Sequence, residues 1–429
     1  TVEQVVKSWP RLHPVQRLAV IDQLINVGDY PLAQKLLDRG GFPGNYEADA
    51  QALRAALLNA KGETHEAAKV AQGVVEAYPR HRRARIELGK AKFATEDDIA
   101  ARENFELAVQ GANNPQLETV IGRFIDAIDN RKRWTADVTF GAAASTNISQ
   151  GSDTRFIYLN GLPFQLDDDS LGSEGAAFWT ALNGAYVHPV ASGLDFVSAA
   201  SVSVRRVTED RLNDSLVAVS LGPRWSFLTG SMPVQVGLYA TGNYRWVSDE
   251  AYAGEWGARL ALTARPEAPG FANISASVTH KNYSSDWLSD DLSYQDGINV
   301  SLSATYDRDL GNGVFAKALA NFVVEDTETQ HLDYTAWNVG AGLGYSPFAG
   351  VTVYAQGSYA ELDYGADSPG FDYARFDRRW DGSLQVTMPA YALSGFVPSL
   401  QYTYTLNSSN VPFYDFDAHG VSFWVTRNY

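Results

Sequence analysis

From residue 134 to the end of the chain, apolar and polar positions alternate in runs of about 10–14 residues. Each run ends at Gly, Pro, Asn or Asp, which are typical turn residues. In the run 194–207, Phe196, Ala200 and Val202 share one face, whereas Asp195 and Ser203 share the other. This period of two predicts β-strands with one apolar and one polar face.

Fourteen such runs follow one another, and an even number brings both ends of a bacterial barrel to the same side. The runs begin near Trp134, Glu174, Leu194, Asp214, Val234, Glu255, Phe271, Gln295, Val314, Tyr334, Val351, Arg375, Phe396 and His419. Because an open strand edge cannot persist in lipid, we expect residues 134–148 to pair with residues 419–429. The pattern predicts a closed antiparallel barrel that spans a bilayer, with apolar residues toward lipid and polar residues toward the lumen.

The connections between these runs alternate in length. Those after the even-numbered runs are short, as in HPVASG and DLGNG, whereas those after the odd-numbered runs are often longer and acidic, as in SDWLSDDLSY. Short turns on one side and long loops on the other are typical of outer-membrane barrels.

A soluble β-sandwich or propeller also alternates, but it explains neither this regularity nor the aromatic residues at the ends of the runs. These aromatic residues are Trp134, Trp225, Tyr244, Trp246, Trp256, Tyr306 and Trp337. No segment is long and apolar enough for a transmembrane helix.

Residues 1–131 follow a different period, with apolar residues at i, i+3, i+4 and i+7. A repeat of 34 residues relates small residues at equivalent positions, and Gly28, Gly62 and Glu96 precede the second helix of each copy. The residues expected to pack where paired helices cross are Ala33, Ala67, Gly89, Ala101 and Phe105. The pattern resembles tetratricopeptide repeats.

About three such repeats would form one curved solenoid, capped by a helix over residues 115–130. The fold class is therefore α + β and multidomain, with a periplasmic helical repeat domain at 1–131 and an outer-membrane barrel at 132–429. The solenoid either binds a polypeptide on its concave face or serves as a spacer or plug. In the short junction, we expect Arg131, Lys132 and Arg133 to lie at lipid headgroups beside Trp134.

Composition narrows the function. The 429 residues carry a net charge of −16 and no cysteine, so disulfides and thiolate metal sites are excluded. The acidic balance lies in the barrel part and its long loops, which argues against nucleic acid as a partner. The chain begins at Thr1, and we expect that a signal peptide was removed.

No catalytic or cofactor motif is present, and the seven histidines are scattered, so neither an enzyme nor a cofactor is expected. Asp415, Asp417 and His419 alternate at the start of the last run and share one face. They could hold a metal ion, but a hydrated rim of the barrel explains them better, and no metal site is predicted.

Charged side chains of both signs have the parity of the lumen. They are Arg205, Arg224, Arg245, Arg259, Arg265, Lys281, Arg375 and Arg379, with Asp137, Asp195, Glu255, Asp307, Asp377 and Asp381. They either pair and stiffen the wall or line a hydrated conduit. Few aromatic residues share this parity, Tyr239, Tyr354 and Trp424 among them.

Together, these features resemble the surface lipoprotein assembly modulator family, the translocons of type XI secretion. The resemblance rests on the repeat-to-barrel junction, ARIELGKAKFATEDDIAARENFELAV through RFIDAIDNRKRW, on ARFDRRWDGSLQV and on the C-terminal YTLNSSNVPFYDFDAHGVSFWVTRNY. It implies an outer-membrane protein, a monomeric barrel in lipid, that moves lipid-anchored or haemophore-like proteins from the periplasm to the cell surface.

Two other functions remain open. A polysaccharide export porin also joins helical repeats to a barrel, although such exporters have longer repeat arrays and aromatic rows along the sugar path. A nutrient porin with a structural helical domain is the third possibility.

Overall fold

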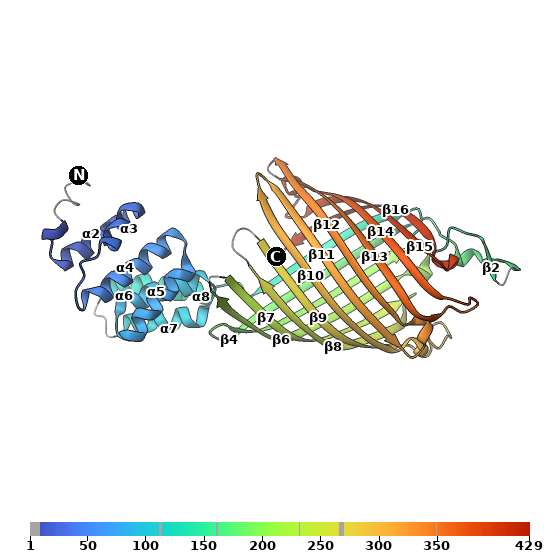
Figure 1. Cartoon of the computed structure of the whole chain (residues 1–429), viewed down its shortest axis with the longest axis horizontal. Coiled ribbons are helices and arrows are strands. Elements are labelled where there is room, and N and C mark those ends of the chain that lie inside the picture. Colours follow the sequence, from blue (N-terminus) through green and yellow to red (C-terminus); the bar gives the residue numbers. More distant parts are fainter. Residues whose placement is uncertain (1–8, 111–113, 160–161, 231, 266–269, 349) are drawn as a thin grey trace. The chain divides into compact units, whose positions relative to one another are not determined.

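A computed structural model describes residues 9–110, 114–159, 162–230, 232–265, 270–348 and 350–429. The chain divides into two units, a helical one that ends at Lys132 and takes in Pro189–Leu194, and a second one that holds the strands (Figure 1). In the described part of the chain, no helix is long and apolar enough to cross a membrane.

The helical unit is a succession of antiparallel helix pairs. Its elements are η1 (Trp9–Arg11), α2 (Pro14–Asn26), α3 (Tyr30–Arg39), α4 (Tyr46–Lys61), α5 (Thr64–Ala77), α6 (Arg82–Ala94), α7 (Asp98–Val109) and α8 (Pro115–Asp129). The last helix ends one residue before the expected Asn130.

The 34-residue repeat is visible in the backbone between the helices of each pair. Gly28, Gly62 and Glu96 have φ values of 84°, 82° and 63°, so all three adopt the left-handed conformation that ends one helix before the next begins. Glycine adopts this conformation without strain, whereas a residue with a Cβ, such as Glu96, does not.

Two histidines in equivalent repeat positions begin helices. The Nδ1 atom of His81 accepts the backbone N–H of Ala84 at 3.2 Å, and that of His13 accepts the backbone N–H of Val15 at 3.4 Å. These histidines are therefore helix caps.

Small residues occupy the places where helices cross. Ala33, Ala67 and Ala101 are fully buried, as is Phe105. A Cβ atom at Gly89 would lie 2.7 Å from the Phe105 ring, so only glycine lets α6 and α7 approach this closely. Each pair buries its apolar face against its neighbours, in three successive clusters of buried side chains.

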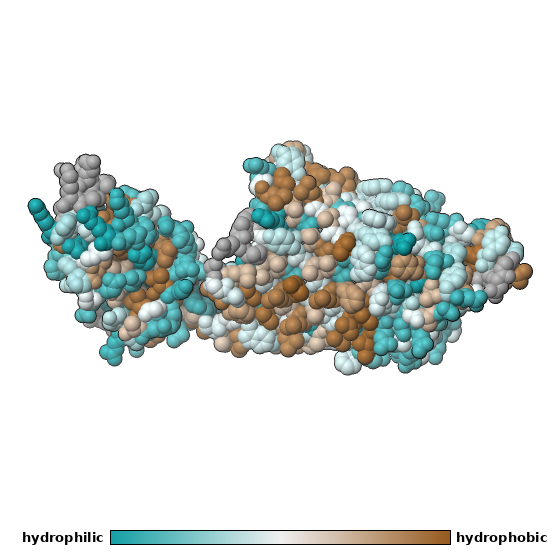
Figure 2. Space-filling view, in the orientation of Figure 1, coloured by the Kyte–Doolittle hydropathy of each residue, from teal (hydrophilic) through white to brown (hydrophobic). Residues whose placement is uncertain are grey.

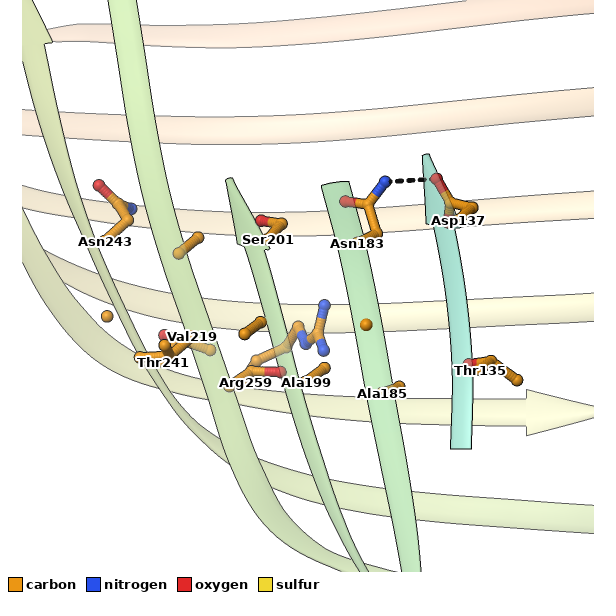
Figure 3. A pocket seen from close by; sticks show the side chains of 15 residues that line it. Thr135, Asp137, Asn183, Ala185, Ala199, Ser201, Val219, Thr241, Asn243 and Arg259 are labelled. Carbon is orange, nitrogen blue, oxygen red and sulfur yellow. Dashed lines mark hydrogen bonds between the residues drawn. The ribbon is translucent and has the colours of Figure 1, made fainter. Parts of the chain in front are cut away.

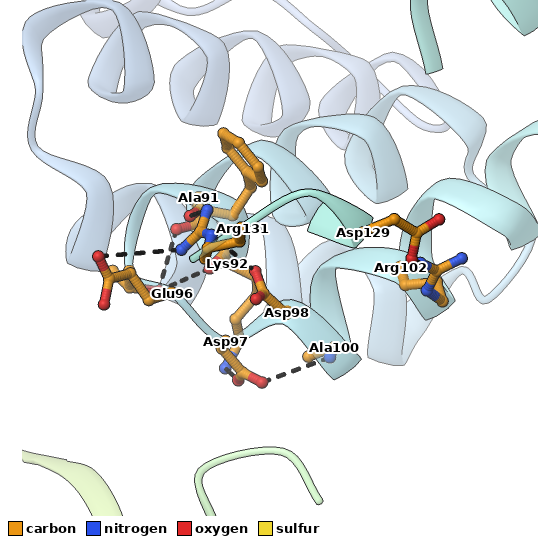
Figure 4. Close-up of polar contacts among 11 residues, drawn as sticks. Ala91, Lys92, Glu96, Asp97, Asp98, Ala100, Arg102, Asp129 and Arg131 are labelled. Atoms are coloured by element: carbon orange, nitrogen blue, oxygen red, sulfur yellow. Dashed lines mark hydrogen bonds and ion pairs between the residues drawn. The ribbon is translucent and has the colours of Figure 1, made fainter. Parts of the chain in front are cut away.

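The junction after α8 differs from the expectation for Arg131. Its guanidinium Nε lies 3.3 Å from the buried Asp98 carboxylate, and Nη2 donates to the Phe93 carbonyl at 3.0 Å (Figure 4). The expectation that Arg131 faces lipid headgroups is wrong, because its guanidinium is ion-paired with a buried carboxylate at the start of α7.

Among the described residues, fourteen strands form a closed antiparallel barrel. They are β1 (Trp134–Ser145), β4 (Gly175–Ala191), β5 (Leu194–Val207), β6 (Asp214–Thr229), β7 (Met232–Val247), β8 (Glu250–Ala264), β9 (Gly270–Tyr283), β10 (Gly297–Gly311), β11 (Val314–Thr327), β12 (Tyr334–Phe348), β13 (Val351–Asp367), β14 (Ala374–Thr387), β15 (Val397–Ser409) and β16 (Phe416–Asn428). The first and last strands close the barrel, with Asp137 opposite Asn428 and Ser145 opposite Gly420.

The predicted strand number, order and closure are confirmed. The largest shift is at β8, which begins at Glu250 instead of near Glu255. Its connection from β7 is a turn at Ser248 and Asp249, whose φ values of 54° and 63° are those of a tight hairpin. We call the end of the barrel that carries the long loops the loop end. The connection from β7 to β8 lies at this end and is nevertheless short.

The outer wall of the barrel is apolar. Exposed Leu, Val and Phe side chains alternate along the strands with inward polar ones, and Figure 2 shows brown patches of hydrophobic residues over the wall. Trp134, Trp225, Trp256 and Trp337 are among the exposed aromatic residues. A wall that exposes this much apolar surface requires lipid as its surroundings.

Candidate functional site in the barrel lumen

The candidate site is the polar interior of the barrel. Small and polar side chains from β1, β4, β5, β6, β7 and β8 surround a cavity of about 390 Å³ (Figure 3). Arg259 extends into this space, and the Asn183 amide donates to the Asp137 carboxylate at 2.8 Å. Because Ala199, Ser201 and similar small residues form this wall, the lumen is open at this level.

Three of the predicted lumen carboxylates pair with predicted arginines. Asp195 accepts from Arg224 at 2.8 Å, between neighbouring strands. On β14, each of two arginines pairs with the aspartate two residues further on: Arg375 Nε lies 2.9 Å from Asp377, and Arg379 Nε lies 3.0 Å from Asp381.

Other predicted charges form ion pairs with residues outside the predicted set. Arg245 donates to Asp214 at 2.6 Å, and Lys317 lies 2.9 Å from Asp307. Paired charges of this kind stiffen the wall and present little free charge to a passing molecule.

Within the described part of the chain, the remaining predicted residues are not in ion pairs with one another. Glu255 accepts an amide hydrogen bond from Asn243 at 2.9 Å, and Arg259 lies over the Tyr239 ring at 5.1 Å. Arg205 and Arg265 are exposed.

The loop end of the lumen is packed with tyrosines and cations, and we call this set the outer-end layer. Its members are Arg245, Tyr252, Lys281, Tyr283, Glu325, Tyr334, Tyr364, Arg375, Asp377 and Tyr414. The Arg375 guanidinium lies 3.2 Å from the centroid of Tyr414 and 4.6 Å from that of Tyr364. Lys281 lies 2.8 Å from Glu325, and both Glu325 and Asp377 are buried.

The expectation of a lumen with few aromatic residues is wrong at this end. Tyr252 and Tyr283 meet edge to face at 5.5 Å, and Tyr334 lies opposite Tyr364 with ring centroids 5.4 Å apart. These half-buried tyrosines fill space between the strands and offer cation–π contacts to the charged side chains beside them.

Strand parity would have found part of this layer. Tyr283 follows Lys281 by two residues and Tyr364 follows Tyr354 by ten. Both distances are even, so the alternation places both tyrosines on the lumen face. Tyr252 could not be found this way, because the register shifts between Arg245 and Trp246 where β7 pairs with β8.

The face shared by Asp415, Asp417 and His419 lies at the loop end. His419 shares a 2.7 Å hydrogen bond with the Tyr402 hydroxyl, and its Nε2 lies 3.7 Å from Asp417. Among the described residues, no group of three or more His, Cys, Asp or Glu is placed to hold a metal ion. Burial raises the pKa of Asp415, and the nearby carboxylates of Asp153 and Asp377 raise it further.

A closed antiparallel barrel with an apolar wall, a polar lumen and a helical unit before its first strand defines an outer-membrane β-barrel protein. The family model of the surface lipoprotein assembly modifier matches residues 208–429, more than half of the chain. The chain belongs to this family, and the resemblance seen in the sequence is confirmed. The barrel lies in the outer membrane, with β1 beginning at the periplasmic end, where the short turns are.

No curated protein sequence matched the chain. Several solved outer-membrane barrels are similar in fold. A loop L8 deletion mutant of OmpT from Vibrio cholerae is 11% identical, with 70% of this chain and 100% of that chain covered and a TM-score of 0.38. OccAB4 of Acinetobacter baumannii is 10% identical, with 70% of this chain and 100% of that chain covered and a TM-score of 0.35. OpdQ of Pseudomonas aeruginosa is 8% identical, with 69% of this chain and 98% of that chain covered and a TM-score of 0.32.

Proposed function

We propose that this protein moves specific lipid-anchored or secreted proteins from the periplasm to the cell surface. The observation that carries the proposal is the family match over the barrel, because surface lipoprotein assembly names both the cargo class and the destination. The polar, largely neutralised lumen supports the proposal, since paired charges do not retain a passing polypeptide.

In this proposal, residues 1–131 form a tetratricopeptide-like domain that selects cargo, and residues 132–429 form a monomeric barrel that passes it. A stack of helix pairs offers an extended surface to a polypeptide, whereas the lumen offers small side chains and neutralised charges. A domain joined to the barrel by a short segment raises the concentration of bound cargo at the periplasmic end.

The outer-end layer has a role in this mechanism. Its tyrosines and ion pairs pack the loop end of the lumen, so a polypeptide that leaves by this route must displace them. The ion pairs of this layer would close the barrel again after each passage.

The test compares the full chain with residues 132–429 in cells that lack the native gene. We expect the barrel to fold and insert, seen as a heat-modifiable band, while surface lipoproteins fall to background in a protease-shaving proteome. Supplying residues 1–131 in trans should restore part of the display. Equal display by the barrel alone would show that the helical unit is a spacer, and an unchanged surface proteome without the protein would refute translocation.

The tyrosines of the outer-end layer are the specific observation that favours a glycan exporter, because aromatic rings stack on sugars. They pack on cations and on each other in a single layer, however, and the family match points to lipoproteins. A loss of surface polysaccharide, with lipoproteins unchanged, would favour that second function.

A further inference from the structure

The connection between β1 and β4 carries a small hairpin at the loop end of the barrel. Its strands are β2 (Phe156–Leu159) and β3 (Leu162–Gln165), with Phe156 opposite Gln165 and Tyr158 opposite Pro163. Figure 1 shows β2 beyond the ends of the barrel strands. In the described residues, the two strands pair only with each other.

The base of this hairpin is firmly anchored. The buried Ser152 hydroxyl donates to the Pro412 carbonyl at 2.8 Å, and the Asp153 N–H donates to the Asp415 carbonyl at 3.1 Å. Ile157 within β2 and Leu166 directly after β3 are also buried. The hairpin is therefore preorganised and not a freely moving loop, so binding through it costs little ordering entropy.

The hairpin nevertheless exposes large apolar side chains on both faces. Phe156 is 53% exposed and Tyr158 68% on one face, and Leu162 is 62% exposed and Phe164 46% on the other. Aromatic and aliphatic side chains held rigidly in water are typical anchors of a protein interface.

The charge beside the hairpin selects the kind of partner. Asp167 and Asp168 are exposed directly after β3, and Asp168 lies 2.9 Å from the Arg155 guanidinium, so carboxylates outnumber cations beside the hairpin. These carboxylates repel an anionic lipid surface and favour a protein with basic residues around an apolar patch. Pro163 lacks an N–H and weakens the β3 edge, so β2 is the edge to which a partner strand can add.

We infer that the β2–β3 hairpin is a docking surface for the exported protein as it leaves the barrel, through a strand edge rimmed by basic residues. This inference rests on the proposed function and names where its cargo is received on the outer side. Phe156 and Tyr158 are its anchors, and the excess of carboxylates over cations beside the hairpin sets the charge of the partner.

The test uses the full-length protein in detergent and a soluble form of the lipoprotein whose display depends on it. The Phe156→Ser, Tyr158→Ser variant should bind this lipoprotein at least tenfold more weakly, the effect of losing two interface anchors. The matched control is Leu288→Ser with Tyr294→Ser, which are 50% and 46% exposed in another loop-end connection. We expect the control to bind within twofold of the wild type.

A photo-crosslinking amino acid at position 158, in otherwise unchanged protein, provides a readout that does not depend on the folding of a variant. Crosslinks to the lipoprotein during export support the inference, and crosslinks to lipopolysaccharide alone overturn it. If removal of residues 1–131 abolishes display while the hairpin variant binds normally, the inference fails and the proposed function stands. If no lipoprotein depends on the protein for display, both fail.

Discussion

The buried ion pair on β14 offers the most sensitive test of how the lumen is built. Asp377 is 1% exposed, and its carboxylate accepts from Arg375 at 3.0 Å and 2.9 Å. Replacing it by asparagine keeps the size and removes the charge. The Arg375 side chain, 17% exposed, would then be a buried cation without its counter-ion.

The expected cost is large because removing one partner of a buried pair destabilises by about 3–5 kcal/mol. The neighbouring Arg379–Asp381 pair provides the matched control, since it has the same i, i+2 spacing on the same strand. Both of its side chains are 34% exposed, and Asp381→Asn should cost only about 0–1 kcal/mol. The two substitutions are chemically identical, and the main difference between the two sites is burial.

The assay is urea unfolding of the full-length protein in lipid vesicles, with the heat-modifiable band as the measure of folded barrel. Asp377→Asn should lower the midpoint strongly and Asp381→Asn only slightly. The double variant Arg375→Leu, Asp377→Leu should recover most of the loss, because an apolar pair leaves no buried charge. Equal midpoints for the two single variants would refute the assignment of a packed outer-end layer.

Three further predictions follow from other parts of the chain. Val202→Arg, on the exposed outer wall, should cost about 2–4 kcal/mol near mid-membrane and reduce assembled protein in outer-membrane fractions. Ser203→Arg, its lumen neighbour, should cost far less, and equal losses would contradict the parity. Glu96→Gly should stabilise the helical unit by about 1 kcal/mol, because the relief of strain in the left-handed conformation outweighs the added entropy of the unfolded chain. An unchanged thermal melt of the helices by circular dichroism would contradict this. Burial, and then the Asp417 carboxylate, raises the pKa of Asp153, so its stabilising contribution is full below its ordinary pKa and is lost as the pH rises through the raised value. Proteolysis of residues 146–174 should therefore be slower at about pH 4, near the ordinary carboxyl pKa, than at about pH 7, relative to a reference peptide, and Asp153→Asn should remove that difference.

The barrel strands were predictable because lipid imposes a strict rule on every membrane-spanning residue. An outward position must be apolar and its neighbour faces water, so apolar and polar residues alternate with a period of two along each strand. The run that contains Phe196 and Val202 shows this pattern, and β5 has the bounds Leu194–Val207. The repeat was readable for a similar reason, since Ala33, Ala67 and Ala101 recur where helices must cross closely.

The tight turn at Ser248 and Asp249 was not predictable in the same way. The segment is polar and acidic like the other loop-end connections, and its two residues with positive φ are neither glycine nor asparagine. The register shift that follows it places Tyr252 in the outer-end layer.

The sequence by itself determined the two kinds of element, the number of barrel strands, and which face of each strand meets lipid, because these depend on local periodicity. The tertiary structure decided which charges meet. Arg245 pairs with Asp214 because β6 and β7 are aligned in one register, and Arg131 binds Asp98 because α8 packs on α6 and α7. The same holds for the β2–β3 hairpin. Its residues belong to one of the long connections of the sequence, and only the structure shows that its base is hydrogen-bonded to the β15–β16 connection. Such contacts join residues far apart in the chain, and the local sequence does not determine the register that brings them together.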